Sequence, residues 1–155
     1  MRRVAAEAQI PTSSLYELFS SQDAVRAAVM REVTDRMGQR LAAMPADLSG
    51  QQWARAALRG LLPLNPQPRQ EVIATLYIGA LGLHNPDLRA AWRLADDAVR
   101  ETCRRALDAM GPDGGQAQQD QLHVVIDRLG RQVVMHDHQR SPDWAIAVLD
   151  RMLPA

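Results

Sequence analysis

Apolar residues recur along most of the chain at spacings of three and four, which place them on one face of an α-helix. Prolines, glycines and short polar runs divide this pattern into separate segments. No segment shows the alternation of β-branched and polar residues that is typical of a strand. The pattern therefore predicts an all-α chain of roughly eight or nine helices with short connections.

Several helix starts can be predicted from capping residues. Ser20 or Ser21 is expected to cap a long helix that runs to about residue 43. Asn85, followed by Pro86, is expected to begin another long helix that ends before the Gly-Pro-Asp-Gly-Gly sequence. Ser141 has the same role in the last segment.

Prolines also predict where helices are interrupted. Three of the six residues from 63 to 68 are prolines, and proline inside a helix removes a backbone donor. We therefore expect a non-helical connection there, followed by a helix from about residue 69 that is apolar on nearly all sides and buried.

The first 19 residues form two short amphipathic segments. Leu15, Leu18 and Phe19 share one face of the second segment, and Thr12, Ser13 and Tyr16 lie on the other. A corner of only three or four residues joins the segments, as in a DNA-binding helix-turn-helix. A simple α-helical hairpin would show the same periodicity, so the pattern leaves both interpretations open.

The charge distribution adds little to the DNA-binding hypothesis. The formal net charge is zero, which argues against a protein that binds nucleic acid through charge alone. The first 40 residues contain six arginines and five acidic residues, a net charge of only +1. The hypothesis therefore depends on the pattern of residues.

Other classes of protein are disfavoured by the sequence. One cysteine, Cys103, cannot form an internal disulfide, and no apolar run approaches the length of a membrane span. No catalytic motif is present, so we expect no enzyme and no cofactor. His136 and His138 are two residues apart, a spacing that directs them away from each other on a helix, and we expect no metal site. The expected location is the cytoplasm.

Residues 4–30, VAAEAQIPTSSLYELFSSQDAVRAAVM, closely resemble the DNA-binding segment of the TetR family of bacterial repressors. The positions that match the family's pattern are Val4, Ala5, Ala8, Ile10, Ser14, Leu15, Tyr16, Phe19, Asp23 and Val25. The resemblance implies a TetR-like fold with a helix-turn-helix head and connecting helix in residues 1–42. Residues 43–155 would then form a helical-bundle domain for ligand binding and dimerisation.

The resemblance also implies which residues bind DNA. Thr12 and Ser13 would begin the recognition helix and face the bases, Tyr16 would donate its hydroxyl to a phosphate, and Arg2 would reach a guanine or the backbone. The complete implied set is Arg2, Arg3, Thr12, Ser13, Ser14, Tyr16 and Gln22.

Some positions depart from the family pattern. Gln9 replaces a glycine, which costs about 1 kcal/mol if the corner keeps a left-handed conformation. Gln22 replaces a phosphate-binding lysine, and Leu18 replaces a polar or aromatic residue. The family also has a further helix before this segment, and without it we expect Val4, Ala5 and Phe19 to expose apolar surface.

For the remainder of the chain, the resemblance implies an effector pocket and a dimer interface, both of which can also be explained as ordinary core. The candidate pocket residues are Trp53, Leu61, Tyr77, Leu81, His84, Trp92 and Cys103. The candidate interface consists of two apolar stripes, Leu122, Val125, Ile126, Leu129 and Val133 in one helix and Trp144, Val148 and Met152 in the next.

These features together predict a homodimeric repressor that binds a pseudo-palindromic, double-stranded DNA operator. A small molecule of unknown identity would release it from the operator. The alternative is a dimeric small-molecule-binding helical module that has lost DNA binding through N-terminal truncation.

Overall fold

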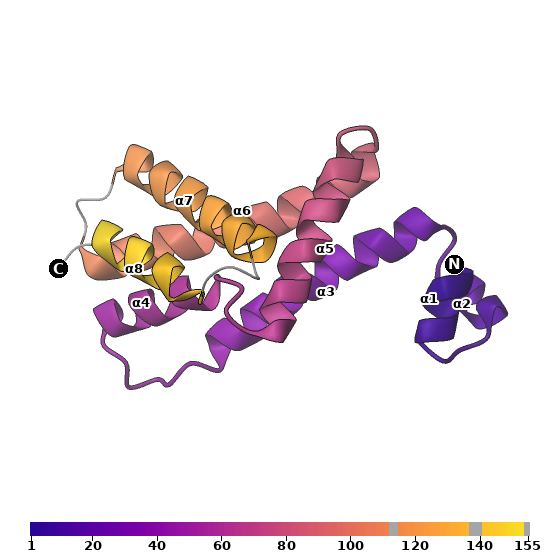
Figure 1. Cartoon of the computed structure of the whole chain (residues 1–155), viewed down its shortest axis with the longest axis horizontal. Coiled ribbons are helices and arrows are strands. Elements are labelled where there is room, and N and C mark those ends of the chain that lie inside the picture. The colour runs from indigo at the N-terminus through magenta and orange to yellow at the C-terminus, as the bar shows by residue number, and fades with distance from the viewer. Residues whose placement is uncertain (112–114, 137–140, 154–155) are drawn as a thin grey trace.

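A computed structural model describes residues 1–111, 115–136 and 141–153, and all regular secondary structure in these ranges is α-helical (Figure 1). The described helices are α1 (Arg2–Glu7), α2 (Thr12–Leu18), α3 (Gln22–Ala42), α4 (Gly50–Gly60), α5 (Pro66–Gly82), α6 (Pro86–Met110), α7 (Gln116–Met135) and α8 (Asp143–Met152). The predicted all-α fold is confirmed. Among these helices, none is long and apolar enough to cross a membrane.

Side-chain caps account for the starts of several helices. The Ser21 hydroxyl accepts a hydrogen bond from the Ala24 amide at 3.0 Å, which confirms one of the two predicted caps of α3. The Asn85 side chain accepts from two amides of the first turn of α6, as predicted. Ser49 and Gln52 form a reciprocal capping box at α4. With Ser141 as its cap, α8 would begin at Pro142. It begins one position later, at Asp143, and Pro142 is its N-cap.

The predicted break over the proline-rich segment is only partly correct. Helix α5 begins at Pro66 and includes Pro68 in its first turn. The first amides of a helix have no intrahelical acceptor, so a proline there removes no hydrogen bond. Proline also fixes a φ angle compatible with helix. The break is therefore limited to the residues that precede Asn65, the N-cap.

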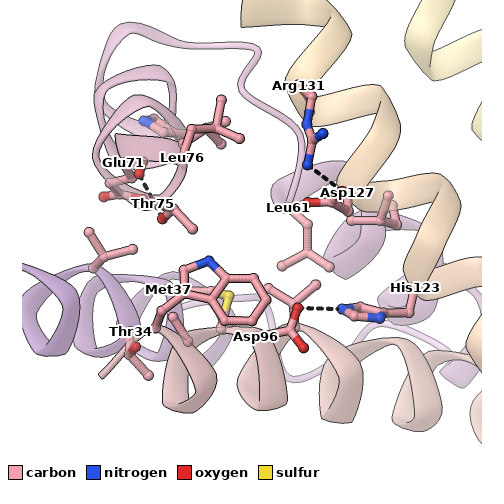
Figure 2. Close-up of a pocket in the computed structure, with 18 of the residues that line it drawn as sticks. Thr34, Met37, Leu61, Glu71, Thr75, Leu76, Asp96, His123, Asp127 and Arg131 are labelled. Atoms are coloured by element: carbon pink, nitrogen blue, oxygen red, sulfur yellow. Dashed lines mark hydrogen bonds and ion pairs between the residues drawn. The ribbon is translucent and has the colours of Figure 1, made fainter. Parts of the chain in front are cut away.

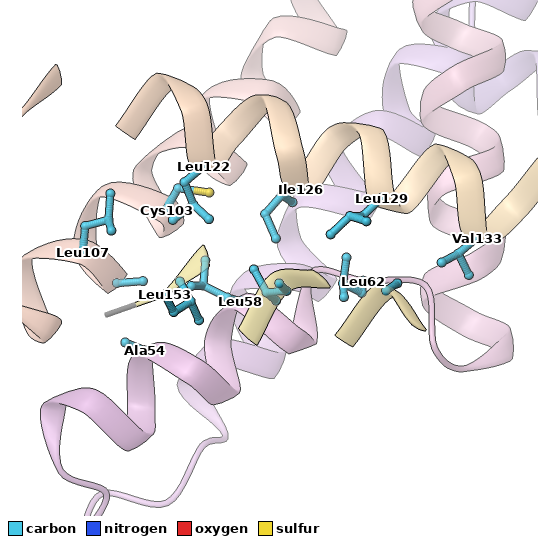
Figure 3. Close-up of a cluster of buried hydrophobic side chains, with 13 residues drawn as sticks. Ala54, Leu58, Leu62, Cys103, Leu107, Leu122, Ile126, Leu129, Val133 and Leu153 are labelled. Carbon is cyan, nitrogen blue, oxygen red and sulfur yellow. The ribbon is translucent and has the colours of Figure 1, made fainter. Parts of the chain in front are cut away.

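The core lies on both sides of α6, the longest helix, which packs against α3, α4, α5 and α7 (Figure 1). One cluster is formed by α4, α6, α7 and α8, and Figure 3 shows its side chains converging between these helices. A second cluster lies between α3, α5 and α6 and contains Met30, Ile78, Leu88, Ala91 and Ala95. Helix α6 therefore connects the two halves of the core.

Helices α1 and α2 form a small pair beyond the N-terminal end of α3, at the opposite end of the molecule from α8 (Figure 1). The N-terminal end of α3 is in turn fixed to the corner between α5 and α6. Asn85 Nδ2 donates to Asp23 Oδ2 at 2.8 Å, and Arg26 donates to both Asp23 and the Tyr77 hydroxyl. The Arg26 guanidinium also lies over the Tyr77 ring, 5.7 Å from its centre. The helix that follows the pair is thus anchored near its start.

Candidate functional site

The first candidate site is the N-terminal helix pair. Gln9, in the turn between α1 and α2, has a φ of 54°. The corner therefore keeps the left-handed conformation, which was the condition for the expected cost of a non-glycine residue at this position. The Ile10 amide donates to the Ala5 carbonyl at 3.0 Å and closes the turn. Ala5 and Leu15 are buried between the two helices. The expectation that Ala5 is exposed is therefore wrong, because α2 covers it.

The residues proposed to contact DNA lie on this pair and at the first position of α3. Arg2, Arg3, Ser13, Tyr16 and Gln22 are exposed. Thr12 and Ser14 are half-buried at the start of α2. Val4 is exposed and Phe19 is half-buried, so some apolar surface of the pair remains open to solvent. The side chains in question are accessible, and their contact with DNA stays a prediction.

The second candidate site is a pocket of about 110 Å³ enclosed by α3, α5, α6 and α7 (Figure 2). Most of its wall is apolar. The lining residues are Val33, Thr34, Met37, Arg40, Leu61, Pro68, Glu71, Val72, Thr75, Leu76, Trp92, Ala95, Asp96, Val99, His123, Ile126, Asp127, Gly130 and Arg131. An apolar cavity with a few polar groups is the usual form of a small-molecule site.

Ion pairs and hydrogen bonds hold the polar groups of the pocket. Arg40 on α3 binds both carboxylate oxygens of the buried Glu71 on α5, at 2.9 and 2.7 Å. His123 Nε2 on α7 lies 3.0 Å from Asp96 Oδ1 on α6 (Figure 2). At the rim, Arg131 donates to Asp127 at 3.2 Å. The first pair joins α3 to α5, the second joins α7 to α6, and the third lies within α7.

Two threonines add hydroxyl groups to the wall. Thr34 donates to the Met30 carbonyl at 3.0 Å, and Thr75 donates to the Glu71 carbonyl at 2.9 Å. Both bonds are made within one turn of the residue's own helix. Each hydroxyl hydrogen is therefore already used, and only the oxygen lone pairs are left to bind a guest.

Only two of the pocket residues predicted from sequence, Leu61 and Trp92, line this pocket. Trp53 packs against the first core cluster and stacks with Arg105, and Cys103 is fully buried in that cluster. Leu81 packs against the second cluster, whereas Tyr77 and His84 are exposed. Three of these five residues therefore belong to the core and two lie on the surface, and a part for any of the seven in ligand binding stays a prediction.

The sequence prediction missed the charged members of the pocket. His123 lies between apolar residues on one face of α7, and Glu71 lies one position before a run of apolar residues. A charged residue on a predicted apolar face is the signal that would have identified them. Their partners, by contrast, come from other helices and have no signature in the sequence.

The predicted dimer stripes lie mostly inside one chain. Leu122, Ile126, Leu129 and Val133 are buried in the first core cluster (Figure 3), and Val125 and Trp144 pack against it. Met152 is half-buried, and Val148 is exposed. The four buried residues therefore pack within the chain, and the dimer interface itself stays a prediction. On the outer side of these helices, the exposed large apolar residues are Val124, Met135 and Val148.

No cluster of three metal-binding side chains occurs within the described ranges. His136 follows the last residue of α7, and His138 lies outside the described residues.

Comparison with known proteins identifies the family. Residues 50–155, which include α4 to α8, match the family model of the C-terminal domain of BetI-type transcriptional repressors. The chain belongs to the TetR family of transcriptional regulators. No curated protein matches it.

A solved structure agrees with the TetR-family fold. The crystal structure of a transcriptional regulator from Rhodococcus sp. Rha1 is similar to this chain with a TM-score of 0.84 and 20% sequence identity. The similarity covers 97% of this chain and 81% of that chain. The segment that matches the family model supplies most of the pocket wall, through Leu61 and helices α5, α6 and α7, and α3 supplies the remainder.

Proposed function

We propose that this TetR-family regulator is a homodimeric repressor that works in the bacterial cytoplasm. Helices α1 and α2 would form a helix-turn-helix that binds one half of a pseudo-palindromic operator. A small molecule in the pocket between α3, α5, α6 and α7 would release the protein from DNA. The family supports the regulatory role, and the geometry of α3 supports the connection between the two sites.

The observation that carries the proposal is that α3 takes part in both candidate sites. Four of its side chains line the pocket: Val33, Thr34, Met37 and Arg40. The helix is continuous from Gln22 to Ala42, and α1 and α2 lie just before its first turn. A displacement of α3 at the pocket therefore moves the helix pair as well.

The pocket also contains the link through which a ligand would act. Arg40 holds α3 against α5 through Glu71, inside the pocket wall. A ligand that binds one arrangement of α3 and α5 better than the other shifts the balance between them. The two heads of a dimer must fit successive major grooves, about 34 Å apart, so a small movement of α3 lowers operator affinity.

DNA binding can be tested by fluorescence anisotropy. The probes would be duplexes enriched from a random-sequence pool on the immobilised protein, together with DNA that flanks its own gene. We expect the affinity to fall steeply as salt is added, because phosphate contacts release counterions. Tyr16→Phe removes one hydroxyl and should weaken binding about fivefold. Arg2→Ala should weaken it about tenfold or more if Arg2 contacts a guanine.

The matched control is Arg93→Ala, which removes an exposed arginine of α6, far along the chain from the helix pair. This variant should bind DNA as the unmodified protein does. Equal losses of DNA affinity for Arg2→Ala and Arg93→Ala would contradict the assignment of the helix pair as the DNA-binding unit.

A second candidate function is a dimeric small-molecule-binding module without DNA binding. The helix pair supports it, because Leu18 is 71% exposed and Gln9 is held in a strained conformation. The buried apolar residues of α1 and α2 are only Ala5 and Leu15. Salt-sensitive binding to any enriched duplex would exclude this alternative, and its complete absence would favour it.

A further inference from the structure

The charged groups that line the pocket already neutralise one another. Both terminal nitrogens of Arg40 bind the two oxygens of Glu71, and Arg131 pairs with Asp127. Asp96 has Arg100 at 3.5 Å and His123 Nε2 at 3.0 Å. A charged guest would therefore enter a mainly apolar cavity without a free counter-ion, which is costly. This favours an uncharged ligand.

The polar atoms that remain for a ligand are mainly acceptors. The hydroxyl hydrogens of Thr34 and Thr75 are donated to backbone carbonyls, which leaves only oxygen lone pairs. His123 has Nε2 at 3.0 Å from Asp96 Oδ1, so this nitrogen already has a partner. Arg40 Nε has no hydrogen-bond partner among the described residues, but surrounding atoms enclose it, out of reach of a guest. A ligand that satisfies these acceptors must bring its own donor.

The size of the pocket limits the rest of the molecule. A cavity of about 150 Å³ holds benzene. This pocket is smaller, about 110 Å³, but it is partly open to solvent, so a single ring fits if part of it extends to the rim. Asp127 and Arg131 at the rim are exposed and leave space for a substituent. Met37, Leu76 and Ile126 offer apolar walls to that body.

We propose that the pocket binds a small neutral molecule with an apolar body and a hydroxyl donor, of the class of phenols and cyclic alcohols, and that the hydroxyl donates to Thr34 or Thr75. That this molecule is the effector of the regulator rests on the proposed function. Its binding is a property of the chain alone.

The test uses isothermal titration calorimetry on the full chain without DNA, with phenol, toluene, benzoate and benzylammonium as probes. These probes share one ring and differ in the substituent, which is a donor, a methyl group, an anion or a cation. We expect phenol to bind at least about tenfold more tightly than toluene, in line with one buried hydrogen bond. Benzoate and benzylammonium should show no measurable binding.

Two variants locate the hydroxyl contact. In Thr34→Val/Thr75→Val the affinity for phenol should fall to that for toluene, whereas the affinity for toluene should not change. The matched control is Thr102→Val, because Thr102 makes the same bond to the Ala98 carbonyl, 2.8 Å long, but does not line the pocket. This variant should bind phenol as the unmodified protein does. Ala95→Leu, which fills the cavity, should abolish binding of both neutral probes, provided that circular dichroism shows a folded protein.

Any of four results overturns the inference: no probe binds, a charged probe binds as tightly as phenol, toluene equals phenol, or the double variant retains phenol affinity. None of them depends on DNA. If phenol binds as expected but leaves the affinity for an enriched duplex unchanged, the proposed ligand release fails while the inference about the pocket stands.

Discussion

At the scale of single residues, the backbone conformation of Gln9 lowers the free energy needed to open the N-terminal helix pair. Its φ of 54° is unfavourable for a residue with a Cβ, and glycine adopts it freely. Gln9→Gly should raise the opening free energy of the pair by about 1 kcal/mol. Hydrogen exchange at the Ile10 and Phe19 amides, which donate across the turn and at the end of α2, measures this opening.

Gln9→Ala is the control for that prediction, because it shortens the side chain but keeps the Cβ. It should leave the exchange rates nearly unchanged. If alanine slowed exchange as much as glycine does, strain at this corner would not be the cause.

Cys103 is a second residue with a measurable individual effect. Burial raises the pKa of its thiol from 9.0 to about 12, because the thiolate is poorly solvated in the core. Between pH 9 and 12 the unfolded chain loses this proton while the folded chain keeps it. The free energy of unfolding must therefore fall as pH rises through this window, by about 1 kcal/mol at pH 10.

Urea unfolding of the unmodified protein and of Cys103→Ala at pH 8 and pH 10 isolates this effect. All other titrating groups are common to both proteins, so the stability difference between them should shift in favour of alanine at pH 10. A difference that is the same at both pH values would contradict the raised pKa.

At the scale of elements, the sequence predicted features that depend on near neighbours and missed those that depend on distant ones. The caps Ser21 and Asn85 and the corner at Gln9 use atoms within a few residues, so they have local signals. The pair Arg40–Glu71 joins positions 31 residues apart. Apolar periodicity also identifies a buried face without saying whether the same chain or a partner covers it. In α7 and α8, the chain itself covers most of the residues of the two stripes, which the periodicity could not show.

The Arg40–Glu71 pair is the ion pair in the pocket wall that joins α3 to α5. Glu71 has a side chain only 8% exposed, whereas Arg40 is 34% exposed, so part of its charge is screened by water. Glu71→Gln should lower the free energy of unfolding by about 2 kcal/mol. The control is Glu32→Gln, which breaks an exposed pair with Arg36 within α3 and should cost less than about 0.5 kcal/mol. If urea unfolding showed the same loss of unfolding free energy for both variants, the buried Arg40–Glu71 pair would contribute no more than an exposed one.

Close packing of α5 on α6 gives a second prediction for elements. A Cβ at Gly82 would lie 3.1 Å from the backbone of Arg89, and backbone atoms cannot move away as a side chain can. Gly82→Ala should therefore destabilise the protein by about 1–3 kcal/mol. Gly38→Ala is the opposite case, because α3 is open there and alanine favours helix by about 1 kcal/mol. Thermal unfolding should move the two melting temperatures in opposite directions, and a stabilising Gly82→Ala would contradict the close approach.

At the scale of the whole molecule, the position of a dimer interface follows from what the monomer leaves uncovered. The inward faces of α7 and α8 are used by the core, so a partner that binds there must contact their outward faces. Val124 on α7 is 63% exposed, and Val148 on α8 is exposed as well. These outward faces, in place of the buried stripes, are the surface on which the proposed homodimer depends.

A charge on this surface should separate the two subunits. We expect the unmodified protein to be dimeric in light scattering and Val124→Glu to be monomeric, because an unpaired carboxylate is costly to bury in an interface. Leu83→Glu is the matched control, since Leu83 is 67% exposed but lies at the end of α5, away from α7 and α8 (Figure 1). This variant should stay dimeric.

The same pair of variants relates dimerisation to DNA binding. A monomer contacts one half-site and loses the phosphate contacts of the other, so the slope of log affinity against log salt should fall to about half for Val124→Glu. Leu83→Glu should keep the full slope. If Val124→Glu remained dimeric, the interface would lie elsewhere on the molecule. If it became monomeric yet kept the full salt dependence, binding would not require two heads, and a single helix pair would account for all of the affinity.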